Sequence, residues 1–266
     1  MSHETGPGAA SPAERIGLSM REAQAPPVPR DAVGWAAKVE RLEVDQRSGA
    51  RGTNVAGRRL TGPVQGFGKM WQKTYRMNLG TAVTPREAIA TWKAHFPEFW
   101  PLGNRFAGAL AGISPGDVAL LDLAVGRGVR LSTGVFVLYA DEESFTLMTP
   151  QGHMFAGWIT FSAQRSGPGT VVQAHVLMRG NDPLYEIGLA LGGHRKEDLF
   201  WVQTLTALGE RLGVAGPRVE TRSECIDPRR QWRNAGNVWH NAAVRSVLQA
   251  AAAPFTARSR RPASGG

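Results

Sequence analysis

The sequence predicts an α+β fold in which a curved antiparallel sheet packs against a long C-terminal helix. Residues 117–180 contain apolar or alternating runs separated by short connectors rich in turn-forming residues, which is typical of consecutive antiparallel strands. Residues 194–213 follow with the apolar periodicity of a long helix. The apolar face of that helix consists of Trp201, Leu205, Leu208 and Leu212.

The size, charge and cysteine content of the chain limit the classes of protein to which it can belong. The chain has 266 residues and a net charge of +9, and its excess of basic residues is spread along the sequence instead of forming one strong patch. Cys225 is the only cysteine, so an intrachain disulfide is excluded and a cytoplasmic location is expected. We find no secretory signal and no apolar run of about 18 residues, so we expect no membrane span.

The composition divides the chain into four parts. Residues 1–57 are expected to be a mostly disordered arm, although the apolar spacing within residues 31–46 is compatible with a short amphipathic helix. Residues 58–214 are expected to fold as the main domain. A C-terminal strand and helix should form an extension over residues 215–252, and residues 253–266 should be a disordered basic tail.

Two elements are expected before the run of strands. Residues 69–79 alternate between apolar and polar side chains and predict a first strand with one buried face. Thr84 and Glu87 then have the spacing of a capping box, with Pro85 at the first helical position. The helix that they begin should bury Ile89, Trp92 and Phe96 and end before Pro97.

The stretch "TPQGHMFAGWITF" at residues 149–161 predicts a hairpin turn followed by a strand with two largely apolar faces. Gly157 in mid-strand indicates a bend, a bulge, or a close approach by a ligand or another backbone, and we favour a bend. His153 is either a polar group at a cavity rim or a hairpin histidine bonded to backbone or water. The row expected to face the long helix is His153, Phe155, Gly157, Ile159 and Phe161.

Two further elements should follow the long helix. Residues 218–226 alternate between small or apolar and charged side chains, which predicts an amphipathic strand in which Cys225 is an inert thiol. Residues 227–251 begin with an Asp-Pro cap and predict a closing helix. Its packed apolar face should hold Trp232, Ala235, Trp239 and Ala242.

This order of elements is similar to that of the START-like, or SRPBCC, helix-grip superfamily, which includes the birch-pollen allergens and the aromatase/cyclase domains. The resemblance covers roughly residues 60–214 and rests on element order and on the long apolar helix. The local sequence resembles a bacterial branch in "GPVQGFGKMWQKTYR", "MTPQGHMFAGWITFS", "NDPLYE" and "GGHRKEDLFW". The resemblance implies a bent sheet around the long helix and a cavity between them, whereas the segments before residue 58 and after Gly213 are additions.

The function that we favour is binding of a small hydrophobic or amphipathic molecule in that cavity, as a carrier, sensor or storage protein. Such sites are mostly apolar with few polar anchors, and His153 or Tyr185 would orient one polar end. The remaining residues expected to contact the ligand are Trp92, Phe96, Phe155, Gly157, Ile159, Trp201 and Leu205.

Two alternatives stay open. One is a cofactor-independent enzyme of cyclase or hydrolase type that uses His153 or Asp182 as a general base. Asp182, Glu186, His194, Glu197 and Asp198 cluster at two helix starts, where acidic residues are common for structural reasons. The other is an interaction module that recruits an acidic partner or nucleic acid through the C-terminal helix and basic tail, although we expect no nucleic acid.

The sequence contains no pattern typical of a cofactor or metal site. Its six histidines form no HxxxH pair and its single cysteine forms no CxxC pair, so we expect no metal. The glycines at residues 62–68 match neither nucleotide-binding pattern and precede a strand, so we expect no phosphate-binding loop and no cofactor. A homodimer is compatible with the extra terminal segments.

Overall fold

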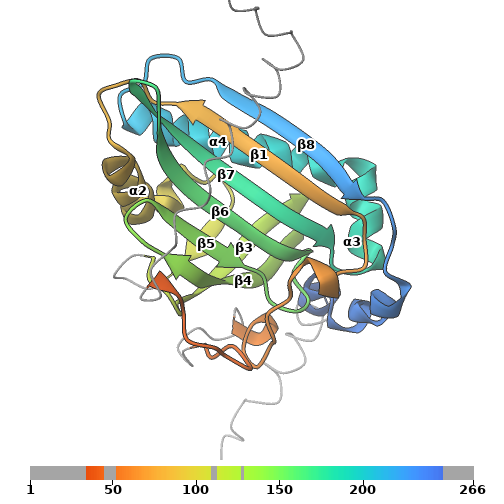
Figure 1. Cartoon of the computed structure of the whole chain (residues 1–266). Helices are drawn as coiled ribbons and strands as arrows, with labels where there is room; N and C mark the ends of the chain where they lie inside the picture. Colours follow the sequence, from red (N-terminus) through yellow and green to blue (C-terminus); the bar gives the residue numbers. More distant parts are fainter. Residues whose placement is uncertain (1–33, 45–51, 109–112, 127–128, 248–266) are drawn as a thin grey trace, which may run out of the picture. The chain divides into compact units, whose positions relative to one another are not determined.

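The computed structural model describes residues 34–44, 52–108, 113–126 and 129–247 (Figure 1). All of these residues belong to one compact unit that begins at Gly34. Residues 1–33 and 45–51 of the predicted arm, which spans residues 1–57, and the predicted basic tail at residues 253–266 lie outside the described residues.

One antiparallel sheet of eight strands has the order β2-β3-β4-β5-β6-β7-β1-β8 (Figure 1). The strands from β2 to β7 form a continuous meander, and β1 is inserted between β7 and β8. The strand bounds are β1 Met70–Asn78, β2 Arg105–Ala107, β3 Val118–Gly126, β4 Val129–Ala140, β5 Ser144–Met148, β6 Phe155–Ser166, β7 Gly169–Gly180 and β8 Val219–Asp227.

Helices α2 and α4 cover one face of this sheet (Figure 1). Their side chains and the inward side chains of β1 and β3–β7 form one hydrophobic core, so the predicted helix-grip architecture is confirmed. The helical segments are η3 Pro63–Gln65, α2 Pro85–Ala94, η4 Phe96–Phe99, α3 Pro183–Gly188, η5 Leu189–Gly193, α4 His194–Arg211 and η6 Trp232–His240. Among the described residues, no helix is both long and apolar enough to cross a membrane.

The predicted capping box begins α2. The Thr84 hydroxyl accepts a hydrogen bond from the amide of Glu87 at 3.2 Å, and the Glu87 carboxylate accepts one from the amide of Thr84 at 2.8 Å. This reciprocal pair satisfies two amides that the first helical turn leaves without partners. The helix ends at Ala94, just before the 3-10 turn that contains Pro97.

The row of β6 that was expected to face the long helix does so. Phe161 is fully buried in the core, and Phe155 and Ile159 pack against the same core. Gly157 is required by a close approach of two backbones, because a Cβ there would collide with the carbonyl oxygen of Leu177 in β7. The register between β6 and β7 runs without a shift through this position, so a bulge is absent there.

The short helix that was compatible with residues 31–46 is absent from the described part of that segment, residues 34–44. Trp35 instead forms an isolated β-bridge with Tyr139, and their rings meet edge to face at 4.9 Å. Leu42 and Val55 are buried on the outer face of β3 and β4. Packing of these apolar side chains on the sheet therefore prevails over the weak helical spacing.

The prediction for the C-terminal extension is correct for its strand and correct only in part for its closing helix. The strand β8 pairs with β1 and thereby covers the edge of β1 that does not face β7. The next element is the 3-10 helix η6, and an α-helical segment follows over residues 242–247, where the predicted Ala242 is buried. The predicted tryptophan stripe is not packed. Trp232 is 74% exposed and Trp239 is 82% exposed.

Candidate functional site

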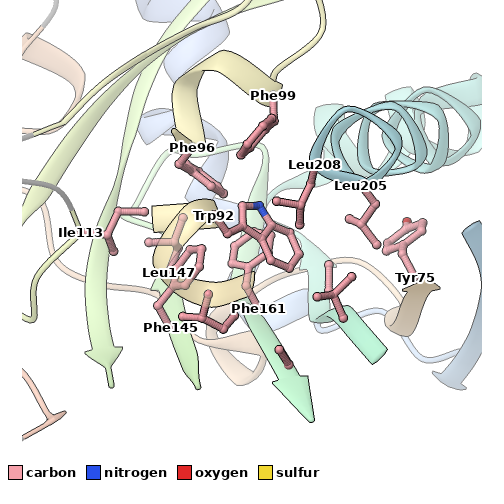
Figure 2. Packing of buried hydrophobic residues seen from close by; sticks show 14 of the residues in the cluster. Tyr75, Trp92, Phe96, Phe99, Ile113, Phe145, Leu147, Phe161, Leu205 and Leu208 are labelled. Atoms are coloured by element: carbon pink, nitrogen blue, oxygen red, sulfur yellow. The ribbon is translucent and has the colours of Figure 1, made fainter. Parts of the chain in front are cut away.

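The interior between the sheet and α4 is the candidate site. Trp92 and Phe96 reach it from α2 and η4, Phe145 and Phe161 from β5 and β6, and Leu205 from α4 (Figure 2). These five side chains are fully buried. The site is thus lined by three separate parts of the chain that only the folded sheet brings together.

Aromatic rings form the centre of this interior. Phe145 and Phe161 stack with ring centroids 4.6 Å apart, and Phe161 also meets Trp92 at 4.9 Å, Phe96 at 5.2 Å and Trp201 at 5.4 Å. Edge-to-face and offset aromatic pairs of this kind each add about 0.5–1.5 kcal/mol beyond the burial of their area. The phenyl ring of Phe161 therefore lies at the centre of the aromatic cluster and contacts four other rings.

Two indole nitrogens in this interior are buried and have no hydrogen-bond partner among the residues that the structure describes. They are Nε1 of Trp92 and Nε1 of Trp100. In Figure 2 the nitrogen of Trp92 lies on the side of Phe99 and Leu208, away from Phe145. A buried donor without an acceptor costs about 1–3 kcal/mol, and proteins seldom leave such groups unsatisfied. The interior therefore contains two donors suited to an acceptor from outside the chain.

The side chains of this interior are buried against one another, and two hollows lie elsewhere on the described part of the chain. One groove of about 520 Å³ lies between residues 39–43 and the residues Gly116, Val118 and Phe136. A second, of about 440 Å³, lies between residues 76–78 and residues 214–220. A molecule could enter the interior only if its side chains moved apart.

A polar cluster lies at the start of α4, against the inner face of β1. The side chain of Lys73 is fully buried, and its Nζ lies 2.9 Å from Oε2 of Glu197 and 2.7 Å from Oδ1 of Asp198. The hydroxyl of Tyr75 donates to the same Asp198 oxygen at 2.7 Å. One lysine and one tyrosine of β1 are thus tied to two consecutive carboxylates of α4.

Burial perturbs the titration of this cluster. Desolvation raises the pKa of Glu197 to about 7, because it outweighs the lowering effect of the Lys73 ammonium. Burial, together with the neighbouring carboxylates, also raises the pKa of Tyr75. Burial lowers the pKa of His194 to about 4, and its Nδ1 has no hydrogen-bond partner. Glu197 can therefore hold or release a proton near neutral pH.

The structure brings most of the predicted ligand contacts together. Trp92, Phe96 and Leu205 are buried members of the core, and Phe155, Ile159 and Trp201 pack against it. Gly157 belongs to the same strand, but its role there is to let the backbone of β6 approach that of β7 closely. Its place in the fold therefore has a structural reason that is independent of any ligand.

The three polar candidates from the sequence have structural partners. Nδ1 of His153 accepts a hydrogen bond from the backbone amide of Phe155 at 3.0 Å. Burial lowers the pKa of this histidine to about 4. Asp182 caps α3 by accepting the amides of Leu184 and Tyr185. The hydroxyl of Tyr185 accepts the amide of Ala243 at 3.0 Å. These side chains stabilise the hairpin, the helix start and the C-terminal segment.

Three residues of the candidate site are not predicted as site residues from the sequence. They are Lys73, Tyr75 and Trp100. Lys73 shares its parity on β1 with Trp71, Tyr75 and Met77, so a charged residue in an apolar row was the available signal. The sequence places the acidic partners Glu197 and Asp198 at a helix start, where they are either an acid–base pair or ordinary helix-start residues. The described residues contain no group of three or more His, Cys, Asp or Glu side chains that could hold a metal ion.

No protein-family model matches this sequence, and no curated protein is significantly similar to it. Solved structures do match. The chain has a helix-grip architecture, in which one antiparallel sheet packs against the long helix α4.

Three of the matching structures illustrate the likeness. The di-domain aromatase/cyclase StfQ from the steffimycin biosynthetic pathway is 12% identical, with 55% of this chain and 53% of that chain covered and a TM-score of 0.42. A START superfamily protein from Mycobacterium smegmatis is 23% identical, with 55% and 98% covered and a TM-score of 0.36. Ara h 8.0201 is 11% identical, with 54% of this chain and 99% of that chain covered and a TM-score of 0.37. This chain thus spans about half the length of StfQ.

Proposed function

We propose that the protein binds a small amphipathic molecule in the interior between the sheet and α4. The observation that carries this proposal is the pair of buried indole nitrogens, on Trp92 and Trp100, that lack an acceptor inside an aromatic cluster. A ligand with an apolar body and one hydrogen-bond acceptor would satisfy both features. Because the interior is packed, binding requires the side chains around Phe96 and Phe99 to move apart.

Removal of one donor tests the proposal. The probe is 1-anilinonaphthalene-8-sulfonate, which has apolar rings and a sulfonate acceptor, and its fluorescence reports binding. Trp92→Phe keeps an aromatic ring but removes the N–H, so we expect about 5–30-fold weaker binding, corresponding to about 1–2 kcal/mol for one hydrogen bond. Native mass spectrometry of the freshly purified protein would detect a molecule that copurifies.

The matched control is Trp158→Phe. Trp158 belongs to β6 but lies beside Gly62, on the sheet face opposite the core, so this change should leave binding unaltered. Equal losses in the two variants would show that the indole of Trp92 has no special role. A wild-type protein that binds neither the probe nor a copurified molecule would refute the proposal.

A second candidate function is acid–base catalysis on the bound molecule. The observation that favours it is Glu197, whose pKa of about 7 lies within the range that suits a general acid or base. This residue replaces His153 and Asp182 as the candidate, because those two side chains are committed to backbone contacts. Glu197→Gln should abolish turnover of any substrate found and leave probe binding intact.

The expected cytoplasmic location stays a prediction.

A further inference from the structure

The helix η6 has its polar and apolar sides reversed relative to a helix that packs on a protein. In a 3-10 helix, residues three positions apart share a face. Asn234, Asn237 and His240 form one such row, and this row contacts the body of the protein. The tryptophans Trp232 and Trp239 lie on the other two rows and are 74% and 82% exposed.

The inward contacts hold η6 firmly in this orientation. Nδ2 of Asn234 donates to the carbonyl of Gly66 at 2.8 Å, and Nδ2 of Asn237 donates to the carbonyls of Gln65 and Asn181 at 2.8 and 2.9 Å. Rotation of the helix to bury its tryptophans would break all three bonds. The exposure of the two indoles is therefore built into the fold.

Positive charge accompanies the exposed rings. Residues 228–247 contain Arg229, Arg230, Arg233 and Arg245 and no acidic residue. Arg229 and Arg230 lie beside Asp227 and Glu186 but remain 83% and 46% exposed. Arg233 is also exposed and shares its row of η6 with Trp239. Indoles and guanidinium groups are thus presented to solvent together.

Aliphatic side chains are exposed on the neighbouring helix. The side-chain amide of Asn241 donates a hydrogen bond to Asp182, and the backbone amide of Ala243 donates one to the hydroxyl of Tyr185. The chain just after η6, which is the blue segment beside α3 in Figure 1, is therefore anchored to the start of α3. On α3 itself, Leu184 is 49% exposed and Ile187 is 56% exposed. Such side chains offer nothing to a nucleic acid, which is bound by cationic and stacking groups. They can, however, enter the apolar part of a bilayer.

We propose that η6 and α3 form a docking surface for an anionic lipid membrane. Tryptophan prefers the membrane–water interface, where its ring is buried and its N–H stays hydrated. Arginine can extend its stem along apolar surface and place its charge among lipid phosphates. The surface combines both residue types with aliphatic neighbours, which is the composition of segments that lie on membranes. This inference is independent of the proposed interior ligand site.

Vesicle flotation tests the proposal with the full chain. The vesicles are pure phosphatidylcholine or phosphatidylcholine with about 30% phosphatidylglycerol, whose negative charge attracts basic segments. Wild-type protein should float with the anionic vesicles and should be released by salt. Trp232→Ser combined with Trp239→Ser should weaken binding by roughly 100-fold, because two large apolar side chains no longer enter the lipid. Arg233→Gln should weaken it about five-fold.

Leu102→Ser is the matched control, because Leu102 is fully exposed but belongs to a different part of the chain. It should bind vesicles as the wild type does. Trp232→Phe combined with Trp239→Phe should still bind but should lose most of the fluorescence quenching that brominated lipids cause, since the indoles that enter the lipid are gone. Circular dichroism would verify that each variant is folded.

Several results would overturn the proposal. These are equal flotation with neutral and anionic vesicles, no flotation at all, or no effect of the double serine change. Tryptophan-dependent self-association in analytical ultracentrifugation would assign the surface to a second copy of the chain. Tryptophan-dependent binding of single-stranded RNA in place of vesicles would assign it to nucleic acid.

Discussion

The buried carboxylate of Glu197 should make the stability of this protein depend on pH in a defined direction. In the folded protein its pKa is raised to about 7 from an ordinary value of 4.5. The folded state therefore holds a proton that the unfolded chain releases, so the contribution of Glu197 to stability is full below about pH 4.5 and declines as the pH rises through about 7. At about 1.4 kcal/mol per pH unit, the loss is about 3 kcal/mol.

Comparison with Glu197→Gln isolates this contribution. Burial holds the pKa of His153 and of His194 at about 4, which makes the protein lose stability as the pH falls below about 6.5, in the opposite sense. Both histidines are present in the variant, so their effect cancels in the difference between the two proteins. The variant should gain about 3 kcal/mol relative to wild type between about pH 4.5 and pH 8.

Urea unfolding at about pH 4.5, 6 and 8 measures that difference, since the midpoint and the slope give the free energy of unfolding. In a domain of this size, about 3 kcal/mol corresponds to a change in Tm of roughly 6–12 °C. If the two proteins keep a constant difference across this pH range, Glu197 is ionised throughout, and both the pH effect and its candidacy as a neutral-pH acid–base group are wrong.

Four further substitutions should alter stability by predictable amounts. Lys73→Met should destabilise the fold by about 3–5 kcal/mol at pH 8 and by less at pH 5, because it leaves Glu197 buried without a cation; urea unfolding at both pH values tests this. Gly157→Ala should cost more than about 2 kcal/mol through the backbone collision, whereas Gly188→Ala in α3 has open space and should gain about 0.5–1 kcal/mol in thermal unfolding. Thr84→Ala should cost about 1 kcal/mol, and an unchanged Tm would deny its capping role.

The main elements of the fold could be predicted because their signals are local. The capping box at Thr84 and the alternation in β1 each lie within about ten residues, and the structure contains both. The strand β2 has only three residues, Arg105–Ala107, too few to show alternation. The 3-10 helix η6 was predicted as an α-helix because its tryptophans suggested a buried stripe, whereas its orientation is set by asparagine contacts with distant backbone carbonyls.

The candidate site was predictable in its apolar part only. Hydrophobic periodicity identifies which side chains of a helix or strand point inward, so Trp92, Phe161 and Leu205 were expected in the interior. The polar cluster joins residues more than 120 positions apart in the sequence, such as Lys73 and Asp198 at a separation of 125. No local pattern encodes such a pairing, because it depends on how α4 crosses β1.

The position of β1 within the sheet has a consequence for how the chain folds. This strand pairs on one side with β7, where Met70 lies opposite Arg179, and on the other with β8, where Trp71 lies opposite Cys225. Both partners begin about 90 or more residues after β1 ends, so loop closure over long distances must precede its pairing. During synthesis, β1 exposes Tyr75 and Met77 until those strands emerge. Completion of the sheet by β8 should therefore be a late and slow step, in which the newly made chain depends most on protection from aggregation.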